Sequence, residues 1–271
     1  MKINAGCELW FDAQADTPII LMLRPRSGAG QWIVSEEYDI APPVPVTEYT
    51  DIYGNLCQRL IAPQGPFRIR TQASVETAET IDVLPGAPFV SVESLPDDVL
   101  IFLLQSRYCP ADQPLIGQQA SEIVGGAEPG YDQAEAIRAW IHQNLKYEYG
   151  TSDGTTSALE TLQKRAGVCR DFTHLGISFC RSLNIPARMV VGYLHDLKPM
   201  DLHAWFEAFV GGRWYVFDAT QAQPRGNRIT VAYGRDAADV AFLTQFGPMT
   251  LERMRVWVDE DVPAAYATAN Y

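Results

Sequence analysis

The spacing of apolar and polar positions divides the chain into two parts of different character. In the first part, short apolar runs are broken by turn residues, and segments 68–71 and 74–77 alternate between the two kinds of side chain. This pattern is typical of strands, and strands at this spacing predict a β-sandwich or barrel over residues 1–105. The expected strands are 9–11, 19–23, 32–34, 56–61, 67–73, 75–77, 81–83 and 99–104.

Helical periodicity begins only after residue 130. Residues 106–130 are rich in proline, glycine and polar side chains, which predicts a linker. Apolar positions then recur every three or four residues over 131–146, 156–166 and 169–183, so we expect three helices there. Gly167 ends the second helix and Cys169 starts the third.

Strand-like segments return after the third helix. Residues 188–194, 203–210 and 213–218 predict three consecutive strands, and 229–233 and 254–258 predict two more, with a short helix at 237–242 between them. The expected fold class is therefore α+β, with helices packed on an antiparallel sheet. We expect a β-sandwich-like domain over 1–105, a linker over 106–130 and a second domain over 131–271, with its core at 131–220 and C-terminal strands at 221–271.

Composition narrows the classes of partner. The chain of 271 residues has a net charge of −12, which argues against nucleic acid, because phosphate contacts need clustered lysine and arginine. The longest apolar runs, 19–23 and 99–104, are far below the roughly 20 residues of a membrane span, so no membrane partner is expected.

Cysteine and histidine usage bears on compartment and cofactors. Five cysteines form no CxxC pair, and the N-terminus shows no secretory signal, so we expect a cytoplasmic protein without a disulfide framework. Four scattered histidines and the missing CxxC predict no metal site, and we expect no cofactor.

Three residues in the second part suggest nucleophilic catalysis. Cys169 stands at the start of a predicted helix, His203 begins a strand 34 residues later, and Asp218 ends the next strand. A helix N-terminus and a nearby imidazolium both favour the nucleophilic thiolate form of a cysteine. A thiol, an imidazole and a carboxylate in this order fit a nucleophile, its base and the group that orients the base.

The predicted hairpin places two of these groups together. Gly211 and Gly212 read as a two-residue turn, so Val210 should pair with Arg213. Continued at the same register, this pairing places His203 diagonal to Asp218 on one face, at a Cα separation of roughly 7–8 Å that side chains can bridge. Structural roles for each residue remain open, because a buried thiol, a packed histidine and a strand-ending aspartate are all common.

Several motifs around these residues resemble the transglutaminase-like superfamily. They are GVCRDFTHL at 167–175, LNIPAR at 183–188, VGY at 191–193, HAWFE at 203–207 and WYVFDAT at 214–220. The resemblance is marked over 131–220. The β-rich first part also resembles the N-terminal domain of bacterial transglutaminase-like proteins, and GRD at 234–236 resembles the family's C-terminal segment.

The resemblance implies a papain-like core in which Cys169 is the nucleophile, His203 the general base and acid, and Asp218 the orienting carboxylate. It implies acyl transfer through a thioester on a peptide or protein substrate. Water as acceptor gives a cysteine peptidase or amidase, which we favour, and an amine gives a protein-glutamine transglutaminase. The alternative from another class is a non-catalytic binding or assembly module on the same fold.

The second oxyanion donor is less defined. The Cys169 backbone N–H is one natural donor, and Tyr147, Tyr149, Asn144 and Gln163 lie upstream of it. Gln163 precedes the nucleophile by six residues, as in papain-like enzymes, but falls on a predicted helix where a solvated side chain is common. Tyr149 is therefore our first candidate and Gln163 the second.

Overall fold

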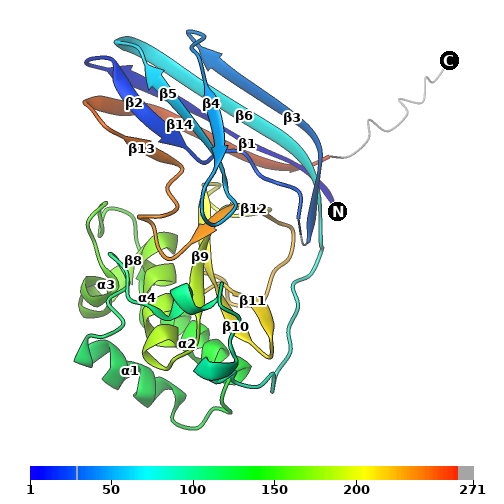
Figure 1. Ribbon diagram of the computed structural model, residues 1–271, viewed down its shortest axis with the longest axis vertical. Coiled ribbons are helices and arrows are strands. Elements are labelled where there is room, and N and C mark those ends of the chain that lie inside the picture. The colour runs from blue at the N-terminus through cyan, green and yellow to red at the C-terminus, as the bar shows by residue number, and fades with distance from the viewer. Residues whose placement is uncertain (29, 262–271) are drawn as a thin grey trace, which may run out of the picture.

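The computed structural model describes residues 1–28 and 30–261. In Figure 1, a β-sandwich forms the upper layer of the molecule and a sheet covered by helices forms the lower layer. The upper layer is a sandwich of two antiparallel sheets. One sheet has the order β14-β1-β6-β3 and the other the order β13-β2-β5-β4. Their bounds are β1 Lys2–Ala13, β2 Thr17–Leu21, β3 Gln31–Ala41, β4 Thr47–Thr50, β5 Leu56–Ala62, β6 Gly65–Thr77, β13 Leu243–Gln245 and β14 Met249–Glu260.

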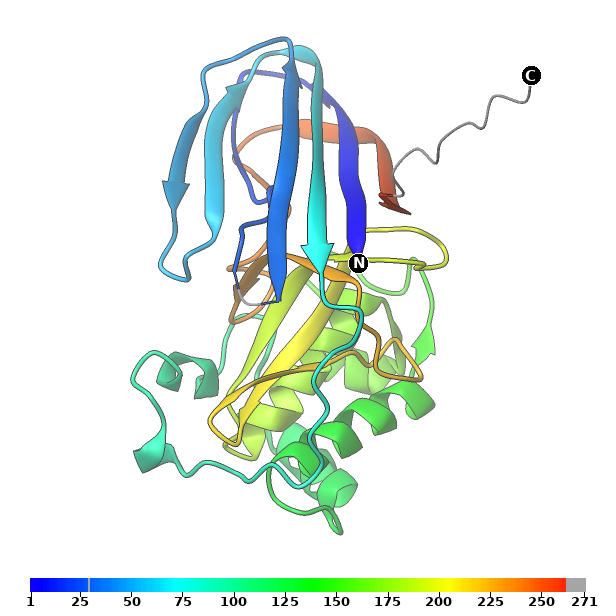
Figure 2. The ribbon, with the colours of Figure 1, turned by 90° about the vertical axis from the view of Figure 1, so that its right-hand side faces the viewer.

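The lower layer is a four-stranded antiparallel sheet covered by helices. The sheet has the order β11-β10-β9-β12, and α4 packs against its central strands (Figures 1 and 2). The strands are β9 Ala187–Leu194, β10 His203–Val210, β11 Arg213–Phe217 and β12 Arg228–Gly234. The helices are α1 Pro114–Val124, α2 Tyr131–Asn144, α3 Ala158–Lys164 and α4 Cys169–Ser182. The short strands β7 Lys146–Tyr147 and β8 Ala166–Gly167 pair in parallel, and η1 Val92–Ser94 and η2 Leu100–Leu103 are 3₁₀ turns.

The predicted α+β class and the β-sandwich are confirmed by this architecture. The hairpin register is also as expected, because Val210 pairs with Arg213 and Phe206 with Phe217. The sandwich core and the helix-sheet core arise from the two periodicities that the sequence shows, two residues in the first part and 3.6 in the second.

The predicted linker is instead part of the helical layer. Residues 114–124 form α1, whose Ile116 and Ala120 are fully buried and whose neighbours are α2 and α4. Pro114 occupies the first turn, where a proline costs no hydrogen bond. The proline and glycine content of this region therefore marks the ends of a helix and not a flexible connection.

The C-terminal strands also differ from expectation. We assigned residues 221–271 to the second domain, but β13 pairs with β2, and β14 pairs with β1 from Ile3–Glu260 to Ala13–Met249. The chain thus leaves the sandwich after β6, builds the helix-sheet layer, and returns to complete both sandwich sheets (Figure 2). The predicted helix at 237–242 is a series of turns, and 99–104 is a 3₁₀ segment and not a strand.

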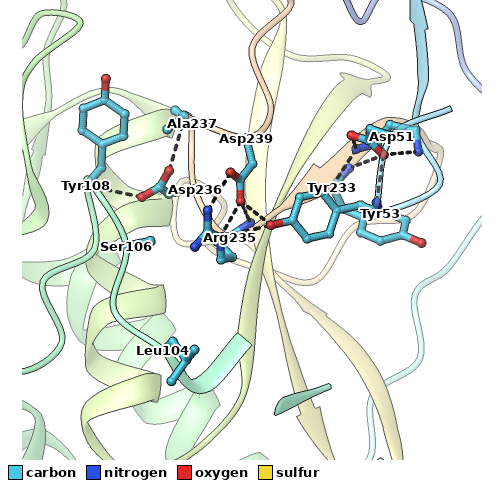
Figure 3. Close-up of polar contacts among 12 residues, drawn as sticks. Asp51, Tyr53, Leu104, Ser106, Tyr108, Tyr233, Arg235, Asp236, Ala237 and Asp239 are labelled. Carbon is cyan, nitrogen blue, oxygen red and sulfur yellow. Dashed lines mark hydrogen bonds and ion pairs between the residues drawn. The ribbon is translucent and has the colours of Figure 1, made fainter. Parts of the chain in front are cut away.

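The end of β12 and the segment after it form hydrogen bonds with the sandwich loop between β4 and β5, and these bonds join the two layers (Figure 3). Tyr53, in the loop between β4 and β5, donates its hydroxyl to Asp239 Oδ2 at 2.6 Å, and Arg235 Nε lies 2.8 Å from the same carboxylate oxygen. Next to them, Asn55 exchanges two hydrogen bonds with the Tyr233 backbone. These polar contacts fix the orientation of the sandwich loops relative to β12.

Helix α4 is held close to the sheet by a small residue. A Cβ on Gly176 would lie 2.5 Å from the Phe206 ring on β10, so a larger side chain would push the helix away. Phe206 is itself fully buried and stacks on Phe217 of β11 at a ring-centroid distance of 5.5 Å. This packing sets the height of the α4 N-terminus above the strands that carry His203 and Asp218.

Candidate functional site

The start of α4 is built around Cys169. Val168 precedes it in an extended conformation, and the Val168 N–H donates to Asp171 Oδ2 at 2.9 Å, so the carboxylate caps the first turn. Ser152 donates a further hydrogen bond to the same oxygen. A Cβ on Gly167 would lie 2.7 Å from Asp171 Cβ, which explains the glycine two residues before the thiol. Cys169 is half-buried, whereas the other four cysteines are buried.

The imidazole and the carboxylate come from the hairpin that the sequence predicted. His203 is the first residue of β10, and Asp218 directly follows β11. His203 Nε2 lies 2.8 Å from Asp218 Oδ2, and both side chains are almost completely buried. The other ring nitrogen, Nδ1, has no hydrogen-bond partner among the described residues, which leaves it available to the thiol.

The electrostatics favour an imidazolium facing a carboxylate. Burial opposes charge on His203, but the Asp218 carboxylate outweighs it and, together with the Cys169 thiol, raises the pKa of His203 to about 9. Burial would likewise raise the pKa of Asp218, but the positive charges of His203 and Arg228 hold it well below its usual range.

The His203 interaction gives a pH-dependent contribution to stability. Because the folded pKa of about 9 lies above the ordinary value of 6.5, the contribution is complete below about pH 6.5 and is lost as the pH rises through 9. We expect the difference in unfolding free energy between wild type and His203→Gln to fall by up to about 3 kcal/mol over that range. Urea titrations at pH 6 and pH 9.5 measure it, and a difference that stays constant with pH would contradict the expectation.

The upstream aromatic residues lie on the Cys169 side of the site. Tyr147 in β7 pairs with Gly167 in β8, which brings it next to the α4 N-terminus. Burial and then the Cys169 thiol raise the pKa of the Tyr147 hydroxyl. Our first oxyanion candidate, Tyr149, is 54% exposed; it packs against Tyr147 and directs its hydroxyl to Asp201 Oδ2 at 3.4 Å. Gln163 is exposed on α3.

A cavity lies beside the loop that follows Asp218. Its volume is about 480 Å³, and its lining contains none of the Cys169, His203 and Asp218 side chains. It is lined by Glu79, Thr80, Ile81, Val83, His195, Asp196, Pro224, Arg225, Gly226 and Asn227. His195 and Asp196 belong to the loop between β9 and β10.

Within the described residues, no three histidine, cysteine, aspartate or glutamate side chains are grouped as metal ligands would be. In the same part of the chain, no helix has the length and apolar character needed to cross a bilayer.

Two family models match the chain. The transglutaminase-like superfamily model covers residues 117–219, and the bacterial transglutaminase-like N-terminal region covers residues 12–76. The first match includes Cys169, His203 and Asp218, and it starts inside α1, in agreement with the place of that helix in the helical layer.

Solved and curated relatives extend the likeness over almost the whole chain. The crystal structure of a "Putative Cysteine Protease from Cytophaga hutchinsonii" is 35% identical, covers 97% of this chain and 91% of that one, and superposes with a TM-score of 0.90. An uncharacterized protein of Mycobacterium leprae is 28% identical over 234 residues, which are 81% of this chain and 82% of the relative. One from Mycobacterium tuberculosis is 26% identical over 247 residues, which are 80% and 77% of the two chains.

Proposed function

The chain belongs to the transglutaminase-like superfamily, and from that premise we propose that it is a thiol-dependent acyl-transfer enzyme with Cys169, His203 and Asp218 as its catalytic residues. The observation that carries the proposal is the 2.8 Å contact between His203 Nε2 and Asp218 Oδ2, which leaves Nδ1 of the same ring without a partner among the described residues, together with Cys169 at the start of α4. A thiol, an imidazole and a carboxylate are the groups that nucleophilic catalysis by a cysteine uses.

In the proposed reaction, the Cys169 thiolate attacks an amide carbonyl and forms a tetrahedral intermediate. His203, as the imidazolium, donates its proton to the leaving amine, and the C–N bond breaks to give a thioester on Cys169. Neutral His203 then removes a proton from water, the hydroxide attacks the thioester, and the carboxylic acid leaves as the thiolate and imidazolium are restored. Asp218 orients the ring throughout and stabilises its charged form.

The negative oxygen of the intermediate needs donors at the α4 N-terminus. The Cys169 backbone N–H is the first, because residues at the start of a helix have no intrahelical acceptor. We propose the Tyr147 hydroxyl as the second donor, because the pairing of Tyr147 with Gly167 brings it beside the α4 N-terminus. Tyr149, whose hydroxyl contacts Asp201, would then support the Tyr147 ring.

Hydrolysis of a peptide or amide bond is the outcome that we favour over transfer to an amine. The support is the relative from Cytophaga hutchinsonii, whose name describes a cysteine protease and which matches this chain over nearly its full length. Peptide and isopeptide libraries, screened with and without an added primary amine, distinguish the two acceptors. Products that carry the amine at a rate above hydrolysis would favour the transferase.

The reactivity of the thiol tests the proposal without a known substrate. We expect iodoacetamide at pH 6 to alkylate Cys169 faster than a thiol in an unfolded peptide by roughly 10-fold or more, because an imidazolium partner maintains the thiolate there. Mass spectrometry of the tryptic peptides locates the adduct, and the buried Cys180 serves as an internal control.

The matched variants are His203→Ala, in which the fast alkylation should be lost, and His142→Ala on α2, in which it should persist. Alkylation of Cys169 in the folded wild type no faster than that of an unfolded thiol would sink the proposal and favour a binding module on this fold.

A further inference from the structure

The Asp218 carboxylate accepts hydrogen bonds at both oxygens. Oδ1 accepts from the backbone N–H of Thr220 at 3.0 Å and from its hydroxyl at 2.7 Å. Oδ2 lies 2.8 Å from His203 Nε2 and accepts a second bond from Arg228 Nη2, also at 2.8 Å. One carboxylate oxygen is therefore shared between the imidazole and a guanidinium, an arrangement that the three-residue triad does not include.

Arg228 is fixed in this position from several sides. It is the first residue of β12, where it pairs with Leu194 of β9, two residues beyond the Gly192 that pairs with His203. Its Nε donates to the Arg225 carbonyl at 2.9 Å, and its guanidinium lies 4.9 Å from the centre of the Trp205 ring. With a side chain only 6% exposed, Arg228 forms an ion pair that solvent screens little.

We infer that Arg228 is a positioning residue of the proposed active site, which acts through Asp218 by fixing the carboxylate and limiting how tightly it holds the proton of the His203 imidazolium. Only the catalytic role that the inference gives to Arg228 rests on the proposed function. The contacts among Arg228, Asp218 and His203 are those of the structure.

The direction of the effect follows from charge. Asp218 stabilises the imidazolium, whereas a permanent positive charge on the same oxygen opposes it. The guanidinium therefore keeps His203 a better proton donor to a leaving amine than a lone aspartate would. In the steps where His203 is neutral, the Arg228 guanidinium still compensates the buried negative charge of Asp218, whereas a neutral imidazole cannot.

Other charged groups near His203 and Asp218 do not replace Arg228. Glu135 and Arg138 on α2 border a small cavity with Asp218, but they pair with each other at 2.7 Å. Asp201, two residues before His203, interacts with the imidazole from its own loop, and Cys169 does so from α4. Among the described residues, Arg228 and His203 are the two cationic side chains that contact the Asp218 carboxylate.

The test measures proton binding by His203 directly. In a Cys169→Ala background, which removes coupling to the thiol, an NMR titration of the imidazole gives the His203 pKa. We expect Arg228→Gln to raise that pKa by about one unit relative to the same background with Arg228 intact. Arg228→Lys, which retains the charge, should stay within about 0.3 unit of it.

Two further variants keep the result interpretable. Arg225→Gln removes a nearby arginine that binds the His195 carbonyl and Gln221, and it should leave the His203 pKa unchanged. If Arg228→Gln does not fold, Arg228→Met retains the aliphatic stem against Trp205 and carries the same expectation. A folded neutral variant whose His203 pKa matches the background would overturn the inference.

The catalytic consequence has its own readout. With Cys169 restored, the alkaline limb of the pH profile of peptide or amide hydrolysis should move to higher pH by the same shift in Arg228→Gln, because His203 must be protonated to donate to the leaving amine. A merely structural loss would lower the rate equally at every pH. Slow alkylation of Cys169 in the wild type would count against the proposed function. It would not count against the inference on Arg228, because the NMR titration measures the His203 pKa even in a protein without catalytic activity.

Discussion

Replacing Asp218 with asparagine is expected to lower the turnover of any peptide or amide substrate by roughly 10⁴-fold. The carboxylate holds one imidazole nitrogen at 2.8 Å and stabilises the charged ring, and an amide offers no negative charge for that purpose. Because the thiol would remain in place, the variant separates orientation of the base from presence of the nucleophile. Alkylation of Cys169 at pH 6 should slow in parallel, since less imidazolium is available to maintain the thiolate.

The same substitution should also reduce stability. Arg228 would remain buried without its counter-charge, which costs about 3–5 kcal/mol. Activity must therefore be measured on protein shown to be folded by circular dichroism, with Asp196→Asn on the exposed loop after β9 as the control. A folded Asp218→Asn protein with activity near that of wild type would exclude Asp218 from catalysis.

The largest loss of stability without a direct effect on the catalytic groups is expected at Arg181. Its side chain is buried near the end of α4 and donates to the carbonyls of Leu104, Ala187 and Arg235 and to the Ser106 hydroxyl. Arg181→Met fills similar space but leaves these acceptors unpaired and removes a positive charge that interacts with the buried Asp236. We expect the unfolding free energy to fall by about 3–4 kcal/mol.

Chemical denaturation of wild type and Arg181→Met measures this loss. The matched control is Arg59→Met on β5, whose exposed side chain should tolerate the change within about 0.5 kcal/mol. Equal losses of unfolding free energy in the two variants would contradict the prediction, because the buried hydrogen bonds of Arg181 would then stabilise the fold no more than a surface arginine does.

Local sequence rules were sufficient for the parts of the site that depend on neighbouring residues. The start of α4 at Cys169 follows from the periodicity after it and the glycine before it, and the His203–Asp218 contact follows from counting back from a Gly-Gly turn. Both are short-range consequences of helix and hairpin geometry. The order and spacing of Cys169, His203 and Asp218 indicate a nucleophile, a base and an orienting group, and the resemblance to a family supports these roles.

Features that depend on distant segments were missed. Arg228 reaches Asp218 because β12 pairs with β9 across the sheet, and no local pattern predicts which strand lies beside another. Tyr147 reaches Cys169 through the two-residue pairing of β7 with β8, which is too short to leave a periodic signal. The signal available for Arg228 was an arginine that begins an apolar strand, a position where a buried charge needs a partner.

The pairing of β14 with β1 has a consequence for synthesis on the ribosome. Strand β1 can pair with β6 early, but its other edge stays open until β14 at Met249–Glu260 has been translated. The sandwich therefore cannot finish folding before β14 is made, and the whole helix-sheet layer is translated before the sandwich closes. During that interval the nascent chain exposes the unpaired edge of β1. Such an edge can bind holdase chaperones or pair with another chain and lead to aggregation.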